Sequence, residues 1–229
     1  MNIVKNTFAK NTFVKNTFVA PNATSDITFN KHQQLRIKHW DNAYQRGTPI
    51  WDRDYVSPLL EKAINTNLII PCRVISLGCG TGTNEIYLAS KGFKVTGIDL
   101  SETALNIACK KATLQNVTIE WICADVLNLT DIGEYDLIFD RGCYHNIRYY
   151  YVQDYIDSLC KLANNNTKIL IISCNSYKPP GVTSEHIKND CLLSKTKKLD
   201  IEHLEEIKSV DHNGNKRNEW LTLIAINSN

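Results

Sequence analysis

Three glycines at alternate positions, Gly78, Gly80 and Gly82, stand directly after an apolar run and directly before a segment of helical character. Glycine permits a tight turn and lets a ligand approach the backbone, while the start of a helix offers free N–H groups. Asp99 closes the next apolar run, 19 residues after Gly80. A carboxylate there can accept hydrogen bonds from both hydroxyls of a ribose. The pattern predicts a site for a ligand that contains a nucleoside.

A second acidic residue, Asp125, ends the following apolar run. It would lie at the edge where an adenine amino group needs an acceptor. Any single aspartate at a strand end can equally be a helix cap or a solvated charge. Three features at successive strand ends favour a binding site, because ligands of open α/β sheets bind outside the carboxyl ends of the strands.

Two other nucleotide-binding motifs fit less well. The glycine run lacks the Gly-Lys-Ser/Thr ending of a P-loop, so it offers no lysine to phosphates. A dehydrogenase stays open as an alternative, although its pyrophosphate favours the wider G-x-G-x-x-G spacing.

The elements that must position these groups alternate between strand-like and helix-like runs. Strands are expected at 72–78, 93–99, 118–125, 135–140 and 167–173, and helices at 83–92, 101–115 and 152–163. This alternation implies right-handed crossovers and a mostly parallel sheet covered on both faces. Two last strand-like runs, 203–211 and 219–227, flank an Asn-Gly turn and indicate an antiparallel hairpin. The expected fold class is α/β, a doubly wound (Rossmann-like), mostly parallel seven-stranded sheet with a C-terminal antiparallel hairpin.

The first 30 residues differ from the rest of the chain. Residues 5–19 carry three copies of a KNTF-based unit, whose period of five matches neither a helix nor a strand. We expect residues 1–30 to be a flexible tail. An organelle-targeting peptide is the alternative, against which the absence of arginine before Arg36 counts. The remaining chain, 31–229, is expected to form one domain whose residues 31–66 make an N-terminal helical lid.

Composition limits the possible partners. With 229 residues and a net charge of +2, the chain can form one α/β domain and carries no broad charge that would attract nucleic acid or a membrane. Its eight cysteines form no C-x-x-C pair, and we interpret them as free thiols in a reducing cytoplasm. A zinc site at Cys143 and His145 is the alternative, but two further ligands at recognisable spacing are missing. We expect no metal and no nucleic-acid or membrane partner.

The segments VISLGCGTGTNEIYLASKGFKVTGIDLSETAL and YDLIFDRGCYHNI resemble class I S-adenosylmethionine-dependent methyltransferases. Within that class the chain is similar to the group of thiopurine, thiol, halide and tellurite-resistance methyltransferases. The segment HWDNAYQRGTPIWD resembles the Trp-rich helix and Pro-x-Trp-Asp turn of the group, and Asp140-Arg141-Gly142 is similar to the Asp-Arg-Gly of thiopurine methyltransferases. The resemblance covers about residues 36–175. It implies S-adenosylmethionine as cofactor and a small-molecule methyl acceptor.

The resemblance also assigns the cofactor contacts. Gly78, Gly80 and Gly82 would contact the methionine end, and Asp99, with Leu100 beside it, would contact the ribose. Asp125 and Val126 would contact the adenine, and Trp40 and Trp51 would cover the cofactor. Core packing is the alternative for each tryptophan.

At the acceptor mouth the resemblance places Asp140, Arg141, Tyr144 and His145. Asp140 and Arg141 are the candidate catalytic residues, and Asp140 is also a candidate cofactor contact. Arg141 can stabilise a thiolate or orient an anionic acceptor through its fixed fork of donors. His145 can equally be a structural loop residue.

The chain departs from the family at two points. Ser76 stands two residues before the first glycine, where the family commonly has an acidic residue. One contact to the methionine amino group is therefore left unassigned. Three asparagines at 164–166 replace the usual Pro-Gly-Gly turn before the fifth strand, and asparagine also tolerates left-handed turn conformations.

A soft nucleophile is the expected acceptor. A sulfonium is already a good leaving group, so the protein mainly aligns the nucleophile with the methyl group. A thiol with a pKa of about 8.5 is partly ionised at neutral pH, whereas an amine or alcohol gains more from a positioned base. We therefore expect a thiol, thiopurine-like or chalcogen acceptor. We also expect the protein to be a monomer or weak dimer. A protein lysine or other N-methyltransferase, and a non-catalytic cofactor-binding module, are the alternatives.

Overall fold

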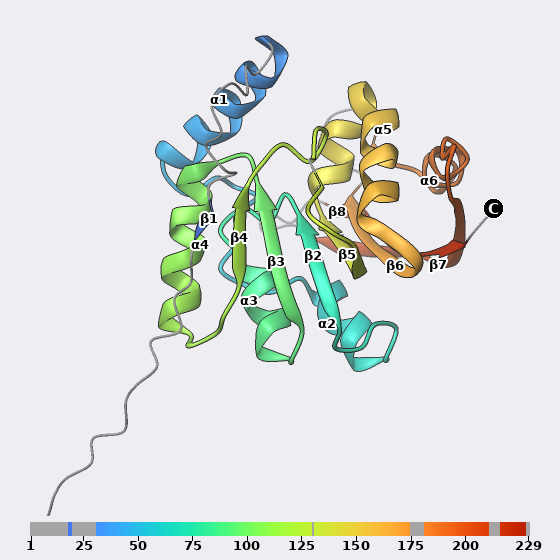
Figure 1. Ribbon diagram of the computed structural model, residues 1–229. Coiled ribbons are helices and arrows are strands. Elements are labelled where there is room, and N and C mark those ends of the chain that lie inside the picture. Colours follow the sequence, from blue (N-terminus) through green and yellow to red (C-terminus); the bar gives the residue numbers. More distant parts are fainter. Residues whose placement is uncertain (1–17, 20–30, 130, 175–180, 211–215, 228–229) are drawn as a thin grey trace, which may run out of the picture.

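One twisted sheet forms the centre of the computed structural model, which describes residues 18–19, 31–129, 131–174, 181–210 and 216–227 (Figure 1). The strands are β1 (Phe18–Val19), β2 (Arg73–Leu77), β3 (Lys94–Asp99), β4 (Glu120–Cys123), β5 (Tyr135–Arg141), β6 (Ala163–Cys174), β7 (Lys198–Val210) and β8 (Lys216–Asn227). Their order is β1-β4-β3-β2-β5-β6-β8-β7. The pairs β6–β8 and β8–β7 are antiparallel and all other pairs are parallel.

Strands β2 to β8 confirm the predicted seven-stranded sheet and its C-terminal antiparallel hairpin. The two-residue β1 adds an eighth strand, parallel to β4, from within the segment predicted to be a tail. The rest of that segment, and the predicted Asn-Gly turn of the hairpin, lie outside the described residues.

Helices cover both faces of the sheet (Figure 1). They are α1 (Lys31–Gln45), α2 (Pro58–Asn65), α3 (Thr83–Ser90), α4 (Glu102–Leu114), α5 (Cys143–Leu162) and α6 (Ser184–Cys191). On β6, Ile169 packs in the buried cluster that includes α5 and α6, while the next residue, Leu170, packs in the cluster of α2, α3 and α4. Successive side chains of a strand point to opposite faces, so one apolar run fills both cores. None of the helices in the described part of the chain is long and apolar enough to cross a membrane.

The parallel register gathers the predicted site at one edge of the sheet. Leu77 at the end of β2 lies opposite Ile98 of β3 and opposite Asp140 of β5, and Asp99 lies opposite Cys123 of β4. The loops that follow these four strands therefore meet at their carboxyl ends.

The last third of the chain differs most from the prediction. Helix α5 begins at Cys143 rather than at 152, and its one non-helical residue is Tyr151, with φ of −135°. Helix α6 was not predicted, and β7 begins at Lys198 rather than at 203. The early start of α5 depends on Gly142, whose φ of 101° is left-handed, a conformation that glycine adopts without strain.

Candidate cofactor and acceptor site

A cavity lies at the carboxyl ends of the parallel strands. Its lining comes from α1 and residues 51–53 and 55, from β2 and the glycine loop with the start of α3, and from the segments that follow β3 and β4. The end of β5, the start of α5, the end of β6 and the start of β8 complete it. The predicted site residues that line it are Trp40, Trp51, Gly78, Gly80, Asp99, Leu100, Asp125, Val126, Arg141 and His145. Gly82, Asp140 and Tyr144 are not part of the lining. Among the described residues, no three His, Cys, Asp or Glu side chains are grouped so as to hold a metal ion.

The glycine loop comes close to the cavity at two of its three glycines. A Cβ on Gly78 would lie 2.9 Å from Cβ of Cys143, and one on Gly80 would lie 2.8 Å from the hydroxyl oxygen of Tyr44. Gly82 has another task, because it precedes α3 with φ of 77° and a Cβ there would lie 2.5 Å from the ring of Trp121. Gly78 and Gly80 line the cavity, whereas Gly82 allows the left-handed turn that begins α3.

Asp99 is held by the backbone around it. Its Oδ2 accepts a hydrogen bond from the amide of Gly80 at 2.8 Å, and its Oδ1 accepts one from the amide of Ser101 at 2.8 Å. Each carboxylate oxygen has a second lone pair, so the side chain can still accept two hydroxyl groups of a ligand. Burial raises the pKa of Asp99, and its hydrogen bonds to backbone amides oppose that rise. The geometry fits the predicted ribose contact.

Asp125 connects the sheet edge to α1. It forms an ion pair with Arg36, and its Oδ1 accepts a hydrogen bond from the amide of Leu127 at 3.0 Å. The guanidinium of Arg36 lies 4.7 Å from the ring centroid of Tyr151. Val126 beside Asp125 adds an apolar contact to the cavity wall.

Trp40 and Trp51 both line the cavity and pack against one another. Their ring centroids are 5.6 Å apart in an edge-to-face arrangement, and Trp51 Nε1 donates a hydrogen bond to the hydroxyl of Tyr44 at 3.2 Å. Asp41 of the same helix accepts bonds from Ser101 Oγ at 2.7 Å and from the amide of Thr103 at 3.0 Å. The first helix is therefore attached to the start of α4, which supports its predicted position over the cofactor site.

Asp140 requires a correction to the predicted acceptor mouth. Its side chain is fully buried and accepts hydrogen bonds from the amides of Cys143 at 3.0 Å and Tyr144 at 2.9 Å, and from the hydroxyl of Tyr155 at 2.8 Å. Burial raises its pKa to about 7. The free amides at the start of α5 attract this carboxylate away from the cavity. Asp140 is therefore a positioning residue for α5, not a group that lines the site.

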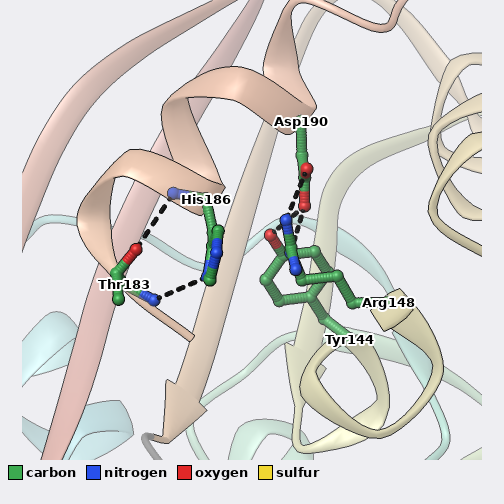
Figure 2. Close-up of polar contacts among 5 residues, drawn as sticks. All are labelled: Tyr144, Arg148, Thr183, His186 and Asp190. Carbon is green, nitrogen blue, oxygen red and sulfur yellow. Dashed lines mark hydrogen bonds and ion pairs between the residues drawn. The ribbon is translucent and has the colours of Figure 1, made fainter. Parts of the chain in front are cut away.

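Tyr144 was also expected at the mouth, and it points instead toward α6 (Figure 2). Its hydroxyl donates to Asp190 Oδ2 at 2.5 Å, and Arg148 Nε donates to the same oxygen at 2.6 Å. Helix α6 begins with a reciprocal cap, in which Thr183 Oγ1 accepts from the amide of His186 and His186 Nδ1 accepts from the amide of Thr183. The Asp190 contacts fasten α6 to α5, and the cap stabilises the start of α6.

Arg141 and His145 both line the cavity, as predicted. Arg141 Nε is buried and has no hydrogen-bond partner among the described residues. His145 Nδ1 accepts a hydrogen bond from the amide of Cys174 at 3.3 Å, so the proton of a neutral imidazole resides on Nε2. Burial, and secondarily the charge of Arg141, lower the pKa of His145 to about 4. At neutral pH the ring is uncharged, and its one ring lone pair is engaged by the amide of Cys174.

Glu85 is a cavity residue that sequence reasoning missed. A glutamate in the first turn of a helix is ordinarily exposed, but Glu85 is only 2% exposed and lines the cavity. Its Oε1 accepts a hydrogen bond from Ser76 Oγ at 2.6 Å. Ser76, which stands where the resemblance leads one to expect an acidic residue, is the feature of the sequence that could have prompted a search for another carboxylate close by.

The family model described as thiopurine S-methyltransferase (TPMT) matches residues 35–220. An uncharacterized methyltransferase of Schizosaccharomyces pombe is 31% identical over 99 residues, which are 43% of this chain and 68% of that protein. Probable thiol methyltransferase 2 of Arabidopsis thaliana is 30% identical over 103 residues, 44% of this chain and 46% of that protein. Magnesium protoporphyrin IX methyltransferase of Synechocystis PCC 6803, solved with bound S-adenosylmethionine, has a TM-score of 0.64 at 15% identity, over 89% of this chain and 100% of that one.

These similarities confirm the Rossmann-like methyltransferase fold and S-adenosylmethionine as the cofactor. The cavity fits that cofactor, because it combines close backbone approach at Gly78 and Gly80 with a buried acceptor at Asp99 and aromatic side chains above. The chain belongs to the thiopurine S-methyltransferase family and is an S-adenosylmethionine-dependent methyltransferase.

Proposed function

We propose that the enzyme methylates a small soft nucleophile, namely a thiol, a thiopurine-like compound or a chalcogen anion. The observation that carries this proposal is the pair Arg141 and His145 in the cavity wall. Arg141 presents a cation with an unpartnered Nε, and the lone pair of His145 is turned to the backbone. Such a site stabilises an acceptor that arrives as an anion, and this imidazole takes no proton from an amine or alcohol.

When bound, S-adenosylmethionine supplies a methyl group on a sulfonium, which is a good leaving group. The task of the chain is then to hold the nucleophile in line at near-attack distance. Arg141 donates hydrogen bonds to the incoming anion through its planar fork. His145 Nε2–H, which lies 3.8 Å from Cys174 Sγ, is a second donor in the same wall. Asp140 positions both, because it fixes the start of α5 between them.

N-methylation is the second candidate, and Glu219 favours it. This carboxylate of β8 lines the same cavity, and its residue lies opposite Cys174 of β6 in the strand register. A carboxylate attracts a cationic amine. That amine would still have to lose its proton, and His145, with a pKa of about 4, is a weak base for the purpose.

Product analysis with a methyl-labelled cofactor tests the proposal. The acceptors are small thiols, selenium and tellurium oxyanions, halides, a primary amine and lysine-containing protein. We expect label in the thiol or chalcogen products. Label in the amine or the protein alone would contradict the soft-nucleophile proposal and support the second candidate.

We also propose that the enzyme acts in the cytoplasm as a monomer or weak dimer, without a metal and without nucleic acid. No disulfide joins the eight cysteines, all of which lie in the described part of the chain, and this suits a reducing compartment. Light scattering of the purified protein tests the oligomeric state, and fractionation of the source cells tests the location. The boundary between a tail at 1–30 and a domain at 31–229, with its lid at 31–66, stays a prediction.

A further inference from the structure

Two polar residues meet in the wall of the cavity, one from β2 and one from α3. Ser76 is 1% exposed and Glu85 is 2% exposed, and both line the cavity beside the glycine loop. The hydroxyl of Ser76 donates to Glu85 Oε1 at 2.6 Å. The two side chains are therefore in direct contact, although they come from different elements of the fold.

The two carboxyl oxygens of Glu85 differ in their surroundings. Oε2 is buried and has no hydrogen-bond partner among the described residues. A buried carboxylate oxygen without a partner loses its contacts with water and gains nothing in return. A cation bound in the cavity would remove that cost.

The other ionisable groups near Glu85 do not supply that partner. Asp99 and Cys79 are acidic neighbours, and Arg141 is the cation that acts on the Glu85 carboxyl. No ion pair joins Arg141 to Glu85 in the described part of the chain. Arg141 acts on Glu85 through space only, so Glu85 Oε2 has no direct cationic partner among the described residues.

We propose that Glu85, oriented by Ser76, binds the ammonium group of the methionine moiety of S-adenosylmethionine. An ammonium has three donors and no acceptor, which suits Glu85 Oε2. Ser76 Oγ donates to Glu85 Oε1 and so holds the carboxylate with Oε2 left for the ligand. The inference rests on the cofactor and the family, not on the identity of the methyl acceptor.

Calorimetry with two ligands tests this assignment without any acceptor present. One ligand is S-adenosylhomocysteine, and the other is its analogue with hydrogen in place of the amino group. Glu85→Gln keeps the side-chain shape and removes the charge. It should lower the affinity for S-adenosylhomocysteine by about 10- to 100-fold, because one charge-assisted hydrogen bond is lost. It should leave the affinity of the analogue within about twofold. Glu61→Gln, an exposed glutamate in the first turn of α2, is the matched control and should change neither affinity.

A double variant keeps the test decisive if Glu85→Gln fails to fold. Ser76→Asp combined with Glu85→Ala returns the carboxylate to position 76, and it should retain the preference of the native enzyme for S-adenosylhomocysteine over the analogue. Loss of that preference in the double variant overturns the inference. An equal loss of affinity for both ligands in folded Glu85→Gln also overturns it, because that result would indicate a purely structural role. Unchanged affinity for both ligands overturns it as well. A preference for amine acceptors would contradict the proposed function and leave this inference standing.

Discussion

Asp99 and Asp140 provide a matched pair of buried carboxylates at the carboxyl ends of β3 and β5, the two parallel strands on either side of β2. Asp99 accepts hydrogen bonds from two backbone amides and lines the cavity. Asp140 accepts hydrogen bonds from two backbone amides and from the hydroxyl of Tyr155, and it does not line the cavity. Replacing each by asparagine keeps the shape of the side chain. The substitution converts one acceptor oxygen into a donor. Only Asp99→Asn should affect the cofactor directly.

The expected magnitudes follow from these contacts. At Asp99 the amide nitrogen must face either a backbone N–H or a ribose hydroxyl, so at least one charge-assisted bond is lost. The affinity for S-adenosylhomocysteine should fall by about 1.5 to 3 kcal/mol, or roughly 10- to 150-fold. At Asp140 the loss falls on the start of α5, and the free energy of unfolding should decrease by about 1 to 3 kcal/mol. The cofactor affinity of Asp140→Asn should stay within about threefold.

Calorimetric titration with S-adenosylhomocysteine and thermal unfolding of both variants measure these effects. Unchanged affinity in Asp99→Asn would refute the ribose assignment. A loss of affinity in Asp140→Asn as large as that in Asp99→Asn would refute the distinction between a ligand-binding and a positioning aspartate.

Three further predictions concern the tail, the contact with α6 and pH. Deletion of residues 1–25 should leave the affinity for S-adenosylhomocysteine within about twofold, because β1 pairs over only two residues at the sheet edge; a large loss by calorimetry would contradict this. Tyr144→Phe should lower the free energy of unfolding by about 1 to 3 kcal/mol, because it leaves Asp190 with one donor fewer, and denaturant titration measures that change. Affinity for S-adenosylhomocysteine should rise as the pH increases through about 7, because burial raises the pKa of Glu85 to about 7 and the ionised form attracts the ligand ammonium. Calorimetry across this range should show no such rise in Glu85→Gln.

The sequence was most informative where the chain repeats a simple pattern. Alternating apolar runs and glycine spacing predicted the sheet, the cavity edge and the location of Asp99 and Asp125, because parallel strands bring their carboxyl ends together. The roles of Asp140 and Glu85 were not predictable in this way. Both depend on whether a short side chain turns toward an amide or toward a cavity, and that is decided by three-dimensional contacts. Helix α6 was missed because its eight residues give a weak periodic signal and its stability comes from the Asp190 contacts with α5.

The most direct test of the proposed chemistry compares Arg141→Ala with His145→Ala in thiol methylation, measured as kcat/KM. Arg141→Ala should lower the rate by about 10- to 100-fold, because a cation that stabilises the bound thiolate is lost. His145→Ala should retain activity within about tenfold, because the imidazole lone pair is turned toward the amide of Cys174 and the ring has a pKa of about 4. Collapse of thiol methylation in His145→Ala, with Arg141→Ala unaffected, would contradict the soft-nucleophile account.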